Sequence, residues 1–100
     1  MADEKKKGKI RAARLDKSER LQRVFWLLAD GREHSTWEIV GLKVAAVNSA
    51  IAELKADGVN DLTIRHRHRD GGNWYQMQRD AKFYQWRRVL QEQAAELRRA

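Results

Sequence analysis

The sequence has no cysteine, no apolar run long enough to span a membrane and no motif typical of a common catalytic site. Without cysteine, the chain can form neither a disulfide framework nor a thiolate zinc site. A spanning helix needs about 18 consecutive apolar residues, and no segment approaches that length. Because no apolar signal core follows the lysine-rich start KKKGK, secretion is not expected and a cytoplasmic protein is the default.

Catalytic chemistry is equally unsupported by the residues. The sequence shows no glycine-rich phosphate loop, nucleophile elbow or paired carboxylates, so we expect a non-enzymatic protein without a cofactor. His66 and His68 form an H-x-H pattern, but no cysteine or clustered carboxylate supplies further metal ligands. No metal site is therefore expected, and the two histidines are interpreted as inward packing or pH-sensitive charge.

Positive charge is what the chain has in excess. Its 100 residues indicate one domain, and 21 lysines and arginines against 14 acids give a formal net charge of +7. This balance favours polyanionic partners, namely DNA, RNA or an anionic membrane surface. Residues 1–15 are rich in Lys, Arg and Ala and are expected to form a disordered basic arm, which is either a solvated tail or a phosphate contact.

Three helices are expected in the domain that follows, residues 16–79. The first begins near Asp16, or at the rival cap Ser18, and ends at Asp30-Gly31. Ser35 and Glu38 form a capping box that starts a short second helix, which Gly41 ends. The third helix is expected over 43–56. Its inward stripe is Val44, Val47, Ile51 and Leu54, and its outward stripe is Ala45, Asn48, Ser49, Ala52 and Lys55.

A β-hairpin is expected over residues 61–78, around a Gly71-Gly72 turn. This turn would pair Asp70 with Asn73 and Arg69 with Trp74. The two-residue period of a strand then divides the side chains between two faces. One face is apolar near its base and carries Leu62, Ile64, His66, His68, Tyr75 and Met77. The other is basic and carries Thr63, Arg65, Arg67, Arg69, Trp74 and Gln76.

The last segment, residues 80–100, is expected to be an amphipathic helix capped by Asp80 and ending near Arg99. Phe83, Trp86, Leu90 and Leu97 form an apolar stripe, interrupted at Gln93, that is too short for a free-standing coiled coil. We expect this helix to pack on the domain itself, to pair with a second copy in a homodimer, or to do both.

The order of these elements predicts an α+β fold: a winged helix-turn-helix with a three-helix core, a two-stranded wing and an extra C-terminal helix. The runs HSTWEI and AVNSAIAELKADG, followed by a hairpin that ends WYQM, resemble the small helix-turn-helix domains of bacteriophage and prophage proteins. The resemblance covers Ser18–Gln78 and implies a DNA-binding fold, often one used in transcriptional control. Ala50 stands where an arginine is frequent in that pattern.

The leading functional prediction is therefore sequence-specific binding of double-stranded DNA by a phage or prophage regulator. In this interpretation Asn48 contacts a base edge and Ser49 a base or a phosphate, and Lys43 and Lys55 contact phosphates at the two ends of the helix. The arginines of the hairpin contact phosphate or the minor groove, with Trp74 stacked on Arg69. Two alternatives stay open: an architectural or packaging factor, such as a terminase small subunit or excisionase, and a winged helix that binds only protein. The predicted nucleic-acid residues are Lys43, Ala45, Asn48, Ser49, Ala52, Lys55, Arg65, Arg67, Arg69 and Trp74.

Overall fold

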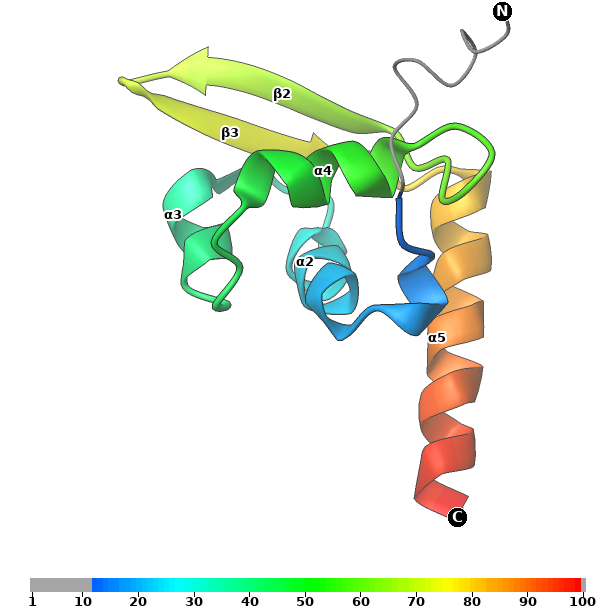
Figure 1. The fold of residues 1–100 in the computed structure, drawn as a ribbon. Helices are drawn as coiled ribbons and strands as arrows, with labels where there is room; N and C mark the ends of the chain where they lie inside the picture. Colours follow the sequence, from blue (N-terminus) through cyan, green and yellow to red (C-terminus); the bar gives the residue numbers. More distant parts are fainter. Residues whose placement is uncertain (1–11, 100) are drawn as a thin grey trace, which may run out of the picture.

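A computed structural model describes residues 12–99 of the chain and shows a small α+β fold (Figure 1). Within that range, four α-helices and one 3-10 helix accompany a three-stranded antiparallel sheet. The elements in chain order are η1 (Leu15–Lys17), α2 (Glu19–Leu28), β1 (His34–Ser35), α3 (Thr36–Val40), α4 (Val47–Lys55), β2 (Ile64–Arg69), β3 (Gly72–Met77) and α5 (Ala81–Arg99). The α+β class expected from the sequence is confirmed.

The last residues of the predicted arm belong to the folded core. Leu15 is fully buried, and its backbone N–H donates to the Asn60 side-chain oxygen at 2.8 Å. The backbone N–H of Ala13 donates to a Glu53 carboxylate oxygen at 3.1 Å. The prediction that the disordered arm extends to residue 15 is therefore wrong for its last residues. The apolar Leu15 side chain is stabilised by burial in the core and not by contact with water. The rest of the predicted arm, 1–11, lies outside the described residues.

Helix α2 starts at the rival cap. The Ser18 hydroxyl accepts a hydrogen bond from the backbone N–H of Leu21, whereas Asp16 lies one turn earlier in η1. The four apolar residues that recur at helical spacing are all buried, as predicted: Leu21, Val24, Phe25 and Leu28. The chain then turns at Gly31, whose φ of +77° is accessible to glycine without strain.

The predicted capping box of α3 is present in full. The Ser35 hydroxyl accepts from the Glu38 N–H, and the Glu38 carboxylate accepts from the Ser35 N–H. His34 lies between two carboxylates, with Nε2 2.9 Å from Asp30 and Nδ1 2.8 Å from Glu38. The imidazole thereby connects the end of α2 to the start of α3.

The prediction that the third helix begins at Lys43 is wrong. Helix α4 begins at Val47, and Lys43 has a left-handed φ of 67° in the turn after α3. Its N–H donates to the Val40 carbonyl at 2.8 Å, so the turn is an extension of α3. Val44 is buried below that turn, and its spacing from Val47 happens to match a helical period. Lys43 and Ala45 therefore lie in the turn that leads into α4.

The hairpin has the predicted faces but a different register. Its two turn residues are Asp70 and Gly71, both with positive φ, which is the conformation that an Asp-Gly type I′ turn favours. Arg69 pairs with Gly72 and Arg67 with Trp74, two residues away from the predicted partners. Because the shift is even, each side chain stays on its predicted face. The prediction that Gly71-Gly72 forms the turn is therefore wrong, while the division of faces is right.

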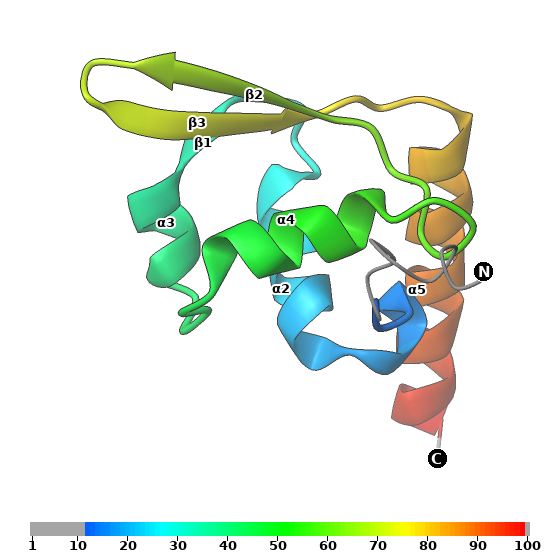
Figure 2. The ribbon, with the colours of Figure 1, turned by 45° about the horizontal axis from the view of Figure 1, so that its top comes forward.

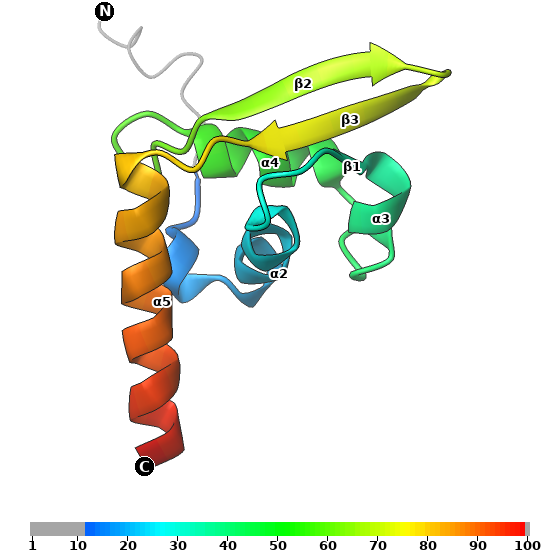
Figure 3. The ribbon, with the colours of Figure 1, turned by 180° about the vertical axis from the view of Figure 1, so that it is seen from behind.

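The sheet has the order β1-β3-β2, so β2 is an edge strand along its full length (Figure 2). Strand β1 pairs only with the middle of β3, through His34–Tyr75 and Ser35–Trp74. Helix α4 lies along one side of the hairpin, and the segment that leads into β1 lies on the other side (Figures 1 and 3). The two faces of the hairpin therefore have different neighbours.

Helix α5 packs on the domain through its first half. Asp80 caps it by accepting from the Phe83 N–H at 3.1 Å, as predicted. The Phe83 ring stacks on Phe25 of α2 with centroids 5.3 Å apart, and Trp86 and Leu90 are also buried. The second half extends beyond the domain, and Leu97 is 73% exposed (Figure 3). Of the two partners expected for this stripe, the structure shows the chain's own core.

Asn60 is a fully buried polar residue that joins three parts of the fold. Its side-chain oxygen accepts from Leu15, and its side-chain nitrogen donates to the carbonyls of Ala13 and Glu53, both at 2.9 Å. Its own carbonyl accepts from the indole N–H of Trp86 at 2.9 Å. Asn60 therefore connects the segment before η1, the last turn of α4 and α5.

Candidate nucleic-acid interface

A groove runs between α4 and the hairpin, with a volume of about 460 Å³. We call it the helix groove. Asn48 and His66 lie on its two sides, and Lys55 and Asp57 lie at the C-terminal end of α4. The remaining lining residues are Ile51, Ala52, Ala56 and Tyr75. The groove therefore combines an amide, a cation, a carboxylate and an imidazole with an apolar floor.

Asn48 is held in the helix groove by the hairpin. It is exposed on the first turn of α4, and the Tyr75 hydroxyl donates to its side-chain oxygen at 3.3 Å. The buried Tyr75 ring is itself stacked against His66 at 5.1 Å. An oxygen that accepts one hydrogen bond keeps a second lone pair, and the amide nitrogen keeps both of its donors. Asn48 is thus oriented while it keeps the groups that a base edge can contact.

The other predicted residues of this stripe lie on the same part of the molecule. Ser49 and Lys55 are exposed on α4, and Ala52 is half-buried between them and the hairpin. Lys43 and Ala45 are also exposed, but in the turn before the helix. Ala50, where the resembling proteins often have an arginine, is fully buried against the core. An arginine at that position of this fold would have to displace core side chains.

Two histidines extend the helix groove along β2. His66 and His68 are both exposed, and a ring nitrogen of each faces the Asn73 side-chain oxygen, at 2.7 and 3.2 Å respectively. The interpretation that these histidines pack inward is wrong for residues this exposed. The sequence shows that both histidines share a strand face with the buried Ile64. It does not show how far the hairpin extends past the core, and this extension leaves the histidines exposed. Among residues 12–99, no group of three potential metal ligands is found.

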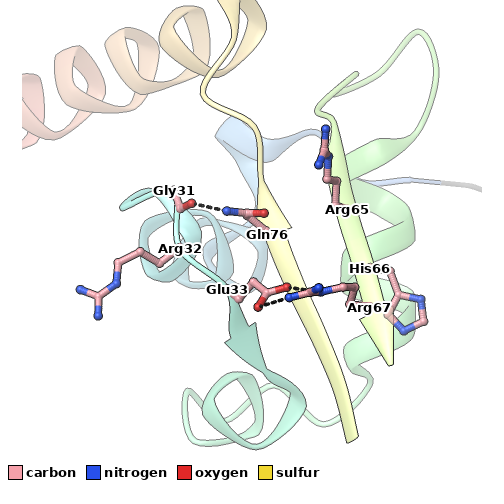
Figure 4. A pocket seen from close by; sticks show the side chains of 7 residues that line it. All are labelled: Gly31, Arg32, Glu33, Arg65, His66, Arg67 and Gln76. Atoms are coloured by element: carbon pink, nitrogen blue, oxygen red, sulfur yellow. Dashed lines mark hydrogen bonds and ion pairs between the residues drawn. The ribbon is translucent and has the colours of Figure 1, made fainter. Parts of the chain in front are cut away.

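A second cavity, of about 690 Å³, lies on the other face of the hairpin (Figure 4). We call it the arginine cleft. Its lining includes Arg32, Glu33, Arg65, Arg67 and Gln76, together with Gly31 and His66. Figure 4 shows Arg65 and Arg67 on one side of β2 and the His66 ring on the other. Alternation along the strand produces this division.

Glu33 is the acidic residue of the arginine cleft. Its carboxylate accepts from Arg67 Nε and Nη2 at 2.9 and 3.3 Å, and it lies 3.2 Å from Arg69 Nη2. The Arg67 hydrogen bonds, and the charges of Arg67 and Arg69, hold the pKa of Glu33 below its usual value. The same contact raises the pKa of Arg67. Nothing in the sequence pattern pointed to Glu33, because it lies 34 residues before its partner.

Trp74 completes this face. The Arg69 guanidinium lies 4.3 Å from the Trp74 ring centroid, which is the predicted cation–π pair. The Trp74 indole N–H donates to the Arg69 carbonyl at 3.2 Å. Arg69 and Trp74 are both half-buried, whereas Arg65 and Arg67 are exposed.

The structure thus separates the predicted nucleic-acid residues into two groups. Asn48, Ser49 and Lys55 lie on the α4 side of the hairpin. Arg65 and Arg67 lie on the opposite side, where Glu33 partly neutralises the charge. The expectation that helix and hairpin arginines form one surface fails because the strand directs the arginines away from α4.

Comparison with protein-family models, with characterised proteins and with solved structures finds no match for this chain. In the part of the chain that the structure describes, no helix has the length and apolarity needed to cross a membrane.

Proposed function

We propose that this protein binds double-stranded DNA in a sequence-specific manner and acts as a phage or prophage transcriptional regulator. In this proposal the fold is a winged helix, α3 and α4 are its helix-turn-helix, and the β2–β3 hairpin is its wing. The observation that carries the proposal is the helix groove, in which the amide of Asn48 is exposed and oriented by Tyr75 and which Lys55 and His66 also line.

The proposed complex places α4 in the major groove. A helix enters the major groove when its outer side chains are small or able to hydrogen-bond, and Asn48, Ser49 and Ala52 meet that requirement. Lys43 before the helix and Lys55 at its end would contact phosphates on the two sides of the groove. The net charge of +7 favours the approach to a polyanion, and no catalytic step is part of the proposal.

The first test is the dependence of duplex affinity on salt. If about five phosphates are contacted, a plot of log affinity against log salt should have a slope of about −4 to −5, because each contact releases condensed counterions. Fluorescence anisotropy with a labelled duplex from the parent genome measures this slope. An affinity that does not change between low and moderate salt would contradict the electrostatic part of the proposal.

The second test separates sequence reading from charge. The substitution Asn48→Ala should cost about 1–3 kcal/mol at one base pair, because a bidentate contact to adenine is lost. Protection of random genomic fragments by the wild-type protein first identifies the preferred site. The affinities for this site and for a scrambled duplex are then compared in both proteins.

A matched control is Lys55→Ala, in the same groove. Loss of this lysine should weaken binding to both duplexes by a similar factor, since a phosphate contact carries no sequence information. If Asn48→Ala also weakens both duplexes equally, Asn48 does not read a base.

A further inference from the structure

The arginine cleft has more positive charge than its own fold can neutralise. Arg32, Arg65 and Arg67 line the cleft, and Arg67 and Arg69 contact Glu33. The Arg79 side chain lies against Gly31 at its edge, with Nε 2.9 Å from the place of a β-carbon on that glycine. Five guanidinium groups thus accompany two carboxylates, those of Glu33 and of Asp30 beside Arg32, an excess of three positive charges. Such an excess in a concave site is typical of a binding site for anions.

Two of these arginines are available to a ligand. Neither the Arg32 nor the Arg65 side chain forms an ion pair or hydrogen bond with any residue in the range 12–99, and both are exposed. Arg67 shows how an arginine of this cleft binds an anion, because two of its nitrogens donate to the Glu33 carboxylate at 2.9 and 3.3 Å. A phosphate group accepts the same forked pair of hydrogen bonds.

The spacing of the arginines favours a regular chain of anions. Arg65, Arg67 and Arg69 occupy alternate positions of β2, so their backbone positions are about 6.7 Å apart. A phosphodiester backbone presents charges at regular intervals along a line, whereas the carboxylates of an acidic peptide have no fixed spacing. Arg65 and Arg67 are the exposed members of this row, and Arg69 is half-buried against Trp74.

The duplex that is proposed to bind α4 cannot also contact the arginine cleft, because of where the cleft lies. The helix groove and the arginine cleft lie on opposite faces of the same two strands, as His66 and Arg67 show in Figure 4. A duplex seated on α4 leaves the arginine cleft directed away from it. We infer that the arginine cleft binds the phosphate backbone of a second DNA segment, so that one protein molecule bridges two duplexes. This inference rests on the proposed binding of DNA by α4. It adds an architectural role, the joining of two duplexes, to that function.

The experiment is a bridging assay. One duplex with the preferred site is attached to beads, and a second, fluorescent duplex without beads is added together with the protein. The wild-type protein should retain the fluorescent duplex on the beads. The double substitution R32A/R65A should reduce this retention about tenfold or more, while the affinity for a single duplex in solution changes by less than about threefold.

Two further variants make the result specific. R98A/R99A removes the same amount of charge from the end of α5, far from the cleft, and should leave retention within about threefold of wild type. Glu33→Gln removes the competing carboxylate and should increase retention. Thermal unfolding followed by circular dichroism verifies that each variant is folded before it is compared.

The outcomes separate the inference from the function on which it rests. Failure of the wild-type protein to bind the duplex on the beads would overturn the proposed function. Normal binding of that duplex without retention of the second would overturn bridging alone. If R32A/R65A leaves retention unchanged, another surface or a dimer carries out the bridging and the inference about the cleft is wrong. If R32A/R65A lowers the affinity for a single duplex as much as it lowers retention, the cleft contacts the first duplex and the inference is also wrong. If R32A/R65A abolishes only the binding of a labelled polyglutamate peptide, the cleft serves an acidic protein and the inference is wrong.

Discussion

Deletion of residues 83–100 should abolish cooperative unfolding without any change in the oligomeric state of the protein. The segment contributes three buried apolar side chains, Phe83, Trp86 and Leu90, and Phe83 stacks directly on Phe25. Truncation of such residues costs about 3–5 kcal/mol for Phe or Trp and about 2–5 kcal/mol for Leu. The sum, roughly 8–15 kcal/mol, is as large as the total stability of most domains, which is about 5–15 kcal/mol.

A shorter deletion serves as the control. Removal of residues 94–100 keeps the three buried side chains and the Gln93 hydrogen bond to the Asp16 carbonyl, and it removes the exposed Leu97. This variant should unfold within a few degrees of the full chain in a thermal melt. Sedimentation of both proteins tests the alternative partner: dimers of the full chain that become monomers in the shorter variant would show that Leu97 and its neighbours join two copies.

Replacement of Asn60 by Ala should cost about 3–4 kcal/mol of the free energy of unfolding. The substitution leaves the buried N–H of Leu15 without an acceptor and the Ala13 carbonyl without a donor, and each unsatisfied group costs about 1–3 kcal/mol. The Glu53 carbonyl keeps a second donor, the N–H of Ala56, so its loss is smaller. Urea unfolding measures the change, and the melting temperature should fall by more than about 12 °C.

Asn48→Ala provides the matched comparison for Asn60. Asn48 is exposed and accepts one long hydrogen bond from Tyr75, so its loss should change stability by less than about 1 kcal/mol. Equal effects of the two substitutions on stability would contradict the role assigned to Asn60. The pair also separates the two amides by function, since Asn48→Ala is expected to change DNA recognition and Asn60→Ala to change folding.

Local patterns predicted much of the fold. Ser35 and Glu38 indicate the start of α3, because a capping box involves only residues within four positions of each other. The buried side of α2 follows from the helical spacing of its apolar residues, and the two faces of the hairpin follow from strand alternation. The candidate residues Asn48 and Lys55 were found in the same way, from one face of one helix.

Predictions failed where two local solutions were nearly equivalent. Asp70-Gly71 and Gly71-Gly72 are both acceptable two-residue turns, and the choice between them sets the register of the whole hairpin. Val44 and Val47 have helical spacing whether or not the intervening residues are helical, so the start of α4 was placed too early. In both cases the sequence permits two backbone paths, and the packing of distant residues selects one.

The sequence by itself determined the α+β class, the buried faces of its elements, the excess of positive charge and the alternation of arginine and histidine along β2. These properties depend on residues a few positions apart, whose relative directions the helix or strand period already fixes. Only the tertiary structure decided that Glu33 meets Arg67, that Asn60 joins three segments and that the arginines face away from α4. Most of these contacts join residues 26 to 47 positions apart, and their geometry depends on how whole elements pack against each other.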